Sequence, residues 1–217
     1  MKGRLSLAVS KAGRTSSSVQ LLAVTKTVPV PILKEAYDLG LREFGENRVQ
    51  EALDKIPELP SDIRWHLIGT LQTNKINKII GKFVLIHSID SLDLAQALSA
   101  RLRDQTQDIL LEVNTSGEAS KAGVEPNEAS KVAEAISRLP GLRLRGLMTI
   151  GPLTEDKEAQ RQAFQSLKRL FEELRQKPWA GESFSILSMG MSGDMEIAIE
   201  EGSSLVRVGT AIFGKRQ

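Results

Sequence analysis

The stretch Leu21-Leu22-Ala23-Val24-Thr25-Lys26-Thr27 decides the fold prediction. Its apolar run is typical of a buried β-strand that is covered on both faces, and Lys26 stands at the carboxyl end of this strand. Burial of a lysine there should lower the pKa of its amine and leave a nucleophile. Such an amine forms Schiff bases with aldehydes. The alternative from the strand alone is a lysine whose ammonium group reaches into water.

The same alternation of short apolar runs and helix-period segments continues along the whole chain. The predicted strands are Leu21–Lys26, Leu41–Phe44, Trp65–Gly69, Phe83–Ser88, Ile109–Asn114, Leu144–Thr149, Phe184–Ser188 and Leu205–Val208. The predicted helices between them are Pro31–Leu39, Val49–Ile56, Thr73–Ile80, Leu92–Arg103, Asn127–Arg138, Lys157–Gln176 and Asp194–Glu200. This order predicts a (β/α)8 barrel of the TIM type that forms one domain over residues 1–217, with an open doubly wound sheet as the alternative.

The two ends of the chain complete the predicted ring of helices. Only Lys215, Arg216 and Gln217 follow the loop after the last strand, which is too few residues for an eighth helix. We therefore expect an extra N-terminal helix around Leu5–Lys11 to take the vacant place.

Composition excludes several classes of protein. The 29 basic and 27 acidic residues give a net charge of only +2, and aromatic residues make up 4%, so neither a polyelectrolyte surface nor base stacking on aromatic side chains is indicated. Cysteine is absent, which removes disulfides and cysteine metal sites and fits a reducing compartment. No apolar stretch reaches the length of a membrane span. We expect a cytoplasmic protein that binds neither nucleic acid nor membrane.

The segments after the last two predicted strands have the character of a phosphate site. Gly190-Met191-Ser192-Gly193-Asp194 leads into a predicted helix, and Gly209-Thr210 follows the final strand. Glycines let backbone N–H groups converge, and a helix N-terminus adds further donors for an anion. In (β/α)8 barrels phosphate is commonly bound by the loops after strands seven and eight. The alternative is that Ser192 and Asp194 only cap a helix and that Gly209 only makes a turn.

Arg207 is a charged residue inside the last apolar strand, Leu205–Val208. At such a position an arginine needs a partner, and a carboxylate such as Glu112 in the fifth strand is one candidate. The other is the ring nitrogen of a bound cofactor, which a fixed positive charge would keep unprotonated.

Long, ordered motifs give the chain a specific family resemblance. They are AVTKT with Lys26, FGENRVQE (44–51), WHLIGTLQTNK (65–75), HSIDS (87–91), VNTSGEASKAG (113–123), RGLMTI (145–150) and LSMGMSGDMEIAIEEGSSLVRVGTAIFG (187–214). Through them nearly the whole chain resembles the pyridoxal phosphate homeostasis proteins, and a cyanobacterial member in particular.

The resemblance implies a fold-type III barrel like the N-terminal domain of alanine racemase, with pyridoxal 5′-phosphate (PLP) as the cofactor. Lys26 would carry PLP as a Schiff base. The phosphate would be held by Ser192, Gly193, Gly209 and Thr210, and Arg207 would face the pyridine nitrogen. Asn47 would lie near the ring hydroxyl, and the pocket would be lined by Met148, Ser188 and Met189. The implied role is intracellular PLP and vitamin B6 homeostasis and supply, with effects on amino-acid and keto-acid balance and without an established catalytic activity.

A racemase-like PLP enzyme is the alternative function. A two-base racemase needs a second acid–base group opposite the lysine. Tyr37 is the only tyrosine and falls in the first predicted helix, away from the strand ends. His66 and His87 could each act as a base, but histidines in such positions are more often packed structural residues. We therefore expect a PLP carrier without catalytic residues, with PLP-dependent apo-enzymes as possible recipients and a monomeric state.

A phosphosugar enzyme is a third interpretation of the predicted phosphate site, and Lys121 is a further candidate residue. A phosphosugar enzyme would need paired carboxylates or metal ligands at strand ends, and Glu46 and Glu112 make no convincing pair, so no metal site is predicted. Lys121 lies on a loop at the expected mouth of the barrel. It could guide or receive PLP, but a solvent-exposed lysine is the commoner case.

Overall fold

The computed structural model describes residues 1–118 and 121–214 and contains a closed parallel barrel. Its strands follow one another around the barrel in chain order, and β8 closes the ring by pairing with β1. The strand bounds are β1 Gln20–Val24, β2 Glu43–Glu46, β3 Arg64–Leu67, β4 Leu85–Ile89, β5 Gln107–Glu112, β6 Leu142–Met148, β7 Ile186–Ser188 and β8 Leu205–Val208. The barrel prediction is confirmed, and the open sheet is excluded because an open sheet would leave β1 and β8 unpaired.

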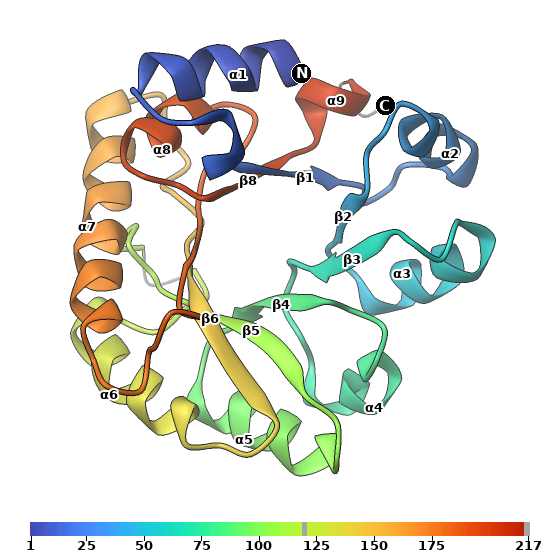
Figure 1. Ribbon diagram of the computed structural model, residues 1–217. Helices are drawn as coiled ribbons and strands as arrows, with labels where there is room; N and C mark the ends of the chain where they lie inside the picture. The colour runs from blue at the N-terminus through green and yellow to red at the C-terminus, as the bar shows by residue number, and fades with distance from the viewer. Residues whose placement is uncertain (119–120, 215–217) are drawn as a thin grey trace.

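Helices surround the barrel in the order in which the chain supplies them (Figure 1). Their bounds are α1 Lys2–Lys11, α2 Val30–Asp38, α3 Val49–Lys55, α4 Ile76–Ile79, α5 Leu92–Leu102, α6 Pro126–Ser137, α7 Lys157–Arg175, α8 Met195–Glu200 and α9 Thr210–Phe213. Short 3-10 turns occupy η1 Ser16–Ser18, η2 Ile56–Glu58 and η3 Thr73–Lys75. The predicted helix Thr73–Ile80 is thus η3 followed by α4.

The prediction for the two ends of the chain is half right. Helix α1 does fill the ring beside α8: Ala8 and Val9 pack with Met195 and Ile199 of α8 and with apolar residues of β8. The expectation that no helix follows β8 is wrong, because Thr210–Phe213 forms one helical turn, α9. A single turn needs only the bonds from Phe213 N to Gly209 O and from Gly214 N to Thr210 O, so the few residues left are enough.

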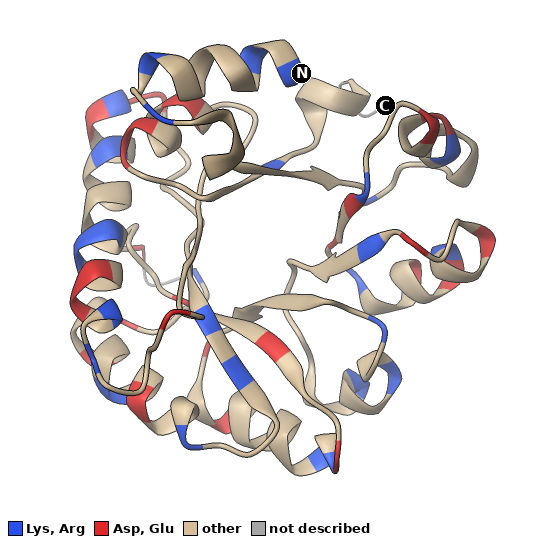
Figure 2. Cartoon of the chain, in the orientation of Figure 1, with Lys and Arg blue, Asp and Glu red and all other residues tan. Residues whose placement is uncertain are grey.

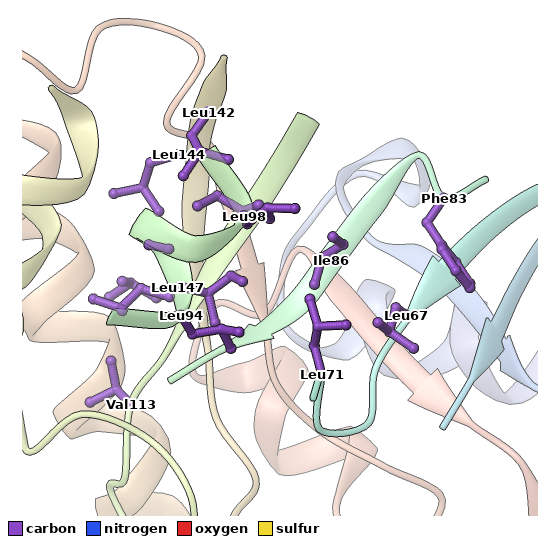
Figure 3. Close-up of a cluster of buried hydrophobic side chains, with 14 of the residues drawn as sticks. Leu67, Leu71, Phe83, Ile86, Leu94, Leu98, Val113, Leu142, Leu144 and Leu147 are labelled. Carbon is purple, nitrogen blue, oxygen red and sulfur yellow. The ribbon is translucent and has the colours of Figure 1, made fainter. Parts of the chain in front are cut away.

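Two apolar layers hold the barrel together. The larger layer lies between the strands and the surrounding helices, and Figure 3 shows part of it, with Leu94 and Leu98 of α5 beside Leu144 and Leu147 of β6. The smaller layer fills the interior, where Leu22, Val24, Ile68 and Leu205 form one cluster and Leu85, Leu110 and Met148 another. Alternate residues of each strand therefore point inward and outward, as in other filled barrels.

Charged residues of both signs are interspersed along α7 (Figure 2). Among the described residues no helix has the length and apolarity to cross a membrane. Few of the described charged residues are buried, and two of them, Glu112 and Arg207, belong to the candidate site.

Candidate functional site

The closed barrel brings the three predicted ligand segments together. Because β8 pairs with both β7 and β1, the segments after β7, β8 and β1 are neighbours at the C-terminal mouth. These segments carry Ser192 and Gly193, then Gly209 and Thr210, and finally Lys26. They are far apart in the sequence, and only the barrel topology makes them one site.

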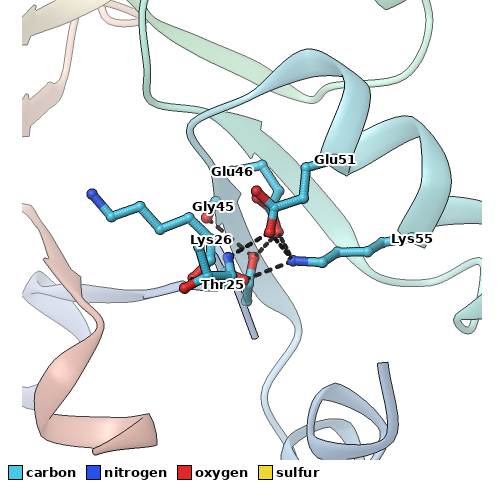
Figure 4. Close-up of polar contacts among 7 residues, drawn as sticks. Thr25, Lys26, Gly45, Glu46, Glu51 and Lys55 are labelled. Carbon is cyan, nitrogen blue, oxygen red and sulfur yellow. Dashed lines mark hydrogen bonds and ion pairs between the residues drawn. The ribbon is translucent and has the colours of Figure 1, made fainter. Parts of the chain in front are cut away.

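Lys26 follows β1 with the same inward phase as Leu22 and Val24, and it is half-buried. The preceding residue, Thr25, points the other way, and its hydroxyl donates to the carboxylate of Glu46 at 2.7 Å. Figure 4 shows the Lys26 side chain extending away from this outer cluster. The alternation of the strand thus places the Lys26 amine on the side of the barrel mouth.

A buried ion cluster supports this strand end from behind. The Lys55 ammonium donates to the Thr25 carbonyl at 2.8 Å and to the carboxylates of Glu46 and Glu51, each at 2.7 Å. Burial raises the pKa of Glu46, and the bonds from Lys55 and Thr25 oppose that shift. Glu51 also accepts from the backbone N–H of Thr27, whose φ of 62° lies in the left-handed region. The backbone on both sides of Lys26 is therefore held by α3.

The predicted phosphate segments form a cradle with unused donors. The Ser192 hydroxyl accepts from Ala211 N at 3.4 Å, which ties the loop after β7 to the first turn of α9. Within residues 1–118 and 121–214, the backbone N–H groups of Ser192, Gly193 and Thr210 have no hydrogen-bond acceptor. A Cβ added at Gly193 would meet open space, so the cradle is accessible. Such converging N–H and hydroxyl groups fit a phosphate-sized anion.

Arg207 lies inside the barrel, because its neighbours Val206 and Val208 pack outward against the layer of α1 and α8. Its guanidinium donates to Ser188 O at 2.9 Å, to Ser188 Oγ at 2.7 Å and to Thr149 O at 2.8 Å. Burial lowers the pKa of Arg207 to about 10, and the charges of Glu112 and Asp194 oppose that shift. The guanidinium is therefore a fixed positive charge at neutral pH. Its partners are a hydroxyl and carbonyls, and Glu112 acts on it only through its charge.

A cavity of about 470 Å³ opens at the ends of β2, β3, β5 and β6, and of the predicted site residues Asn47 is the one among its lining residues. It is lined by Asn47, Arg48, Ile68, Gly69, Thr70, Glu112, Lys121, Ala122 and Ile150. Asn47 Oδ1 is buried and has no hydrogen-bond partner among the described residues. An orphaned buried acceptor is costly unless a ligand supplies a donor, so Asn47 fits the hydroxyl group that the predicted cofactor carries.

The remaining predicted pocket residues divide between the two faces of their strands. Ser188, the last residue of β7, points inward to Arg207, and Met148 is fully buried in the interior layer. Met189 is fully buried in the outer layer against the helices, because it is adjacent to Ser188 and so takes the opposite face. We therefore leave Met189 out of the binding site. Lys121, whose amine donates to Gly151 O at 3.0 Å and pairs with Glu118, lies on the cavity wall.

Sequence reasoning missed the supporting residues of the site. Lys55 and Glu51 are four residues apart on α3, a spacing that is usually a surface pair, and the sequence has no signal that their partner is Glu46. Thr149 was assigned only to a strand end, yet its carbonyl holds Arg207. Contacts of this kind depend on packing between elements.

Glu112 lines the cavity and has a carboxyl whose pKa is clearly raised. It is 5% exposed, and burial, with a smaller contribution from Asp90, raises the pKa of its carboxyl to about 7 against the opposing charge of Arg207. A carboxyl with a raised pKa binds more protons in the folded state than in the unfolded state between about pH 4.5 and 7. Its contribution to stability is thus complete at low pH and is lost as the pH rises through about 7.

Replacement of this group should remove that pH dependence. We expect Glu112→Gln to be no more stable than the unaltered protein near pH 4.5 and to exceed it by about 2 to 3 kcal/mol at pH 8. Urea unfolding of both proteins across this range measures the difference. A difference that stays constant with pH would show that Glu112 is not held protonated by the cavity.

Comparisons with known proteins show the family and the fold of the chain. Residues 6–217 match the family model described as the N-terminal domain of alanine racemase. A protein of Aquifex aeolicus (strain VF5) named pyridoxal phosphate homeostasis protein is 44% identical over 217 residues, which cover 99% of this chain and 94% of that protein.

Solved structures extend the comparison. The structure of PipY from Synechococcus elongatus PCC7942 with PLP bound is 36% identical and has a TM-score of 0.82, over 99% of this chain and 100% of that chain. An alanine racemase from Clostridium difficile 630 has a TM-score of 0.77 at 15% identity, and the match covers 99% of this chain but 56% of the racemase. The racemase likeness shows the shared barrel fold alone.

Proposed function

The chain belongs to the pyridoxal phosphate homeostasis proteins, a family built on the alanine racemase N-terminal fold, and on that premise we propose that it binds PLP as a Schiff base on Lys26. The observation that carries the proposal is the meeting of three distant segments at the adjacent ends of β7, β8 and β1. They supply the amine of Lys26, the cradle of Ser192, Gly193, Gly209 and Thr210, and the charge of Arg207. PLP supplies an aldehyde and an electron-accepting ring.

Each group of the site has a separate task toward this cofactor. The cradle binds the phosphate through N–H and hydroxyl donors, and Asn47 Oδ1 accepts from the ring hydroxyl. The Lys26 amine would bind the aldehyde carbon, with the aldehyde oxygen leaving as water. Arg207 places its positive charge toward the ring nitrogen and disfavours protonation there, because two adjacent cations repel. A ring that stays unprotonated is a weaker electron sink, so the site favours holding the cofactor over carbanion chemistry.

We place this binding in a role of PLP homeostasis and supply rather than turnover. Several features support a carrier. Tyr37 donates its hydroxyl to Asp62 Oδ1 on the outside of α2, and His66 and His87 are bonded to each other inside the barrel. None of these three groups reaches the mouth as a second base. We further propose that residues 1–217 act as one domain, as a cytoplasmic monomer, with PLP-dependent apo-enzymes as recipients.

A racemase-like activity remains the second candidate, and Glu112 is the observation that favours it. Its carboxyl lines the cavity and has a pKa of about 7, so it can exchange a proton at neutral pH. The two functions separate in one assay. A carrier transfers PLP to an apo-enzyme and leaves L- and D-amino acids unchanged. A racemase interconverts the amino acids and loses that activity in Glu112→Gln.

Absorption spectroscopy tests the binding proposal. We expect the protein with PLP to show a visible absorption band that borohydride bleaches. Lys26→Ala should lack this band, because the variant has lost the amine that forms the Schiff base. Lys121→Ala is the matched control, since Lys121 also lies at the mouth, and it should retain the band. A colourless protein in the presence of PLP would contradict the cofactor assignment.

A further inference from the structure

A continuous chain of hydrogen bonds crosses the interior of the barrel from its N-terminal end to Arg207. Glu43 Oε2 of β2 lies 2.6 Å from His66 Nε2 of β3, and His66 Nδ1 lies 3.0 Å from His87 Nε2 of β4. His87 Nδ1 lies 3.0 Å from Ser188 Oγ of β7, which accepts from the Arg207 guanidinium at 2.7 Å. The chain thus joins four neighbouring or facing strands to the residue proposed to face the cofactor ring.

The two ends of this chain determine the direction of every bond in it. A guanidinium can only donate and a carboxylate can only accept. Since Ser188 Oγ accepts from Arg207, its proton is free to go to His87 Nδ1. His87 then carries its own proton on Nε2 and donates to His66 Nδ1, and His66 donates from Nε2 to Glu43. Every donor points toward Glu43, and both rings carry one proton, on Nε2.

If the hydrogen bonds ran in the opposite direction, fewer polar groups would have a partner. It requires a doubly protonated His66 paired with Glu43 and a His87 that donates from Nδ1 to Ser188. The Ser188 hydroxyl would then receive two donors, and its own proton would have no acceptor among the described residues. A buried hydroxyl without an acceptor is costly.

The charges around the chain also oppose a charged His87. This ring is fully buried, and burial, together with the positive charge of Arg207, holds the pKa of His87 well below its usual range. At the outer end, Glu43 is shared with the exposed Arg64, at 2.8 Å. Burial is the largest single influence on Glu43 and raises its pKa, but the hydrogen bond from His66 and the bond and charge of Arg64 act together against it, and the net shift of the pKa is downward. Glu112 and Asp194 are the further titratable groups whose charges act on Arg207.

We propose that His66 and His87 are positioning residues for Arg207: with Glu43 they hold the Ser188 hydroxyl as an acceptor, so that the guanidinium keeps one orientation toward the cofactor ring. The proposal rests on the proposed PLP site. Its consequence is that a residue at the opposite end of the barrel, Glu43, contributes to cofactor binding at the mouth.

Nitrogen NMR of the histidines tests the bond directions in the protein without cofactor. The chain has only two histidines, and both belong to this network, so ¹⁵N-histidine labelling reports on nothing else. We expect each ring to carry one proton, on Nε2, at neutral pH, as the bond directions require. A proton on Nδ1 of His87 at neutral pH would overturn the proposal, whether or not the protein binds PLP.

A matched pair of variants tests the effect on binding. In His87→Gln the amide can still accept from Ser188 and donate to His66, whereas His87→Leu can do neither. We expect His87→Leu to bind PLP about tenfold more weakly and His87→Gln to remain within about threefold of the unaltered protein. The pH titration of the bound cofactor's absorption should shift only in His87→Leu, because a loosened Arg207 no longer opposes ring protonation.

Failure of the positioning role and failure of PLP binding would give different results. Equal PLP affinity and equal titrations in both variants would overturn the positioning role. If the unaltered protein bound no PLP, the proposed function itself would fail, while the NMR result would still report the direction of the chain. Thermal unfolding of both variants shows whether they are folded, and the NMR experiment decides the matter if His87→Leu is not.

Discussion

Replacing Lys55 by methionine is expected to destabilise the protein by about 3 to 5 kcal/mol, because it leaves the fully buried carboxylate of Glu46 without its counter-ion. Methionine matches the aliphatic part of lysine, so the loss is chiefly electrostatic. The bond from Lys55 to the Thr25 carbonyl disappears as well, which loosens the strand end that presents Lys26. Urea unfolding at neutral pH measures the loss.

The chain offers a matched control on another helix. Lys168 pairs with Glu172 four residues away on α7, and both side chains are more than a third exposed. Lys168→Met should cost less than about 0.5 kcal/mol. Addition of Glu46→Gln to Lys55→Met should recover part of the loss, because the neutral amide is cheaper to bury. A cost of Lys55→Met as small as that of Lys168→Met would show that the cluster contributes nothing to stability.

The second large effect is expected at Gly146 in β6. Its φ is 150°, and an added Cβ would lie 1.8 Å from the carbonyl oxygen of Ile186 on the paired strand β7. Gly146→Ala must therefore separate two backbones near the base of Ser188. We expect a loss of about 4 kcal/mol from backbone strain and steric overlap together.

Gly3→Ala is the control for this substitution. Gly3 lies in α1 and has nothing within 4 Å of an added Cβ, so alanine there should be neutral or stabilising by up to about 1 kcal/mol. Chemical unfolding of both variants compares them. If Gly146→Ala were as stable as Gly3→Ala, the close approach of β6 and β7 would not exist in solution.

The strand bounds were predictable where polar or turn residues flank a short, mostly apolar run. The prediction Leu205–Val208 matches β8 at both ends, because apolar residues alternate with the inward Arg207 and the run is bounded by serine and glycine. The start of β5 was missed because it begins at the polar residue Gln107. Gln107 is buried through a side-chain bond to Phe83 O that local pattern does not show.

The site was predictable to the extent that it lies at strand ends. Lys26, Ser192 and Thr210 could be proposed from the sequence because the barrel rule assigns ligands to the C-terminal mouth, and Arg207 because a charge inside an apolar strand needs a partner. The period of two in a strand should also have separated Ser188 from Met189. The His66–His87 pair was beyond prediction, since it requires the register between neighbouring strands and the inward phase of both, which only the closed barrel establishes.

The most direct test of the central claim is to find the residue that carries the cofactor. The protein is incubated with PLP, reduced with borohydride, digested and mapped by mass spectrometry, which converts a reversible Schiff base into a permanent mark. We predict that the pyridoxyl group is found on Lys26, and that neither Lys121 nor Lys55 carries it in comparable amount. Its absence from Lys26 in a protein that still binds PLP would contradict the assignment of the site.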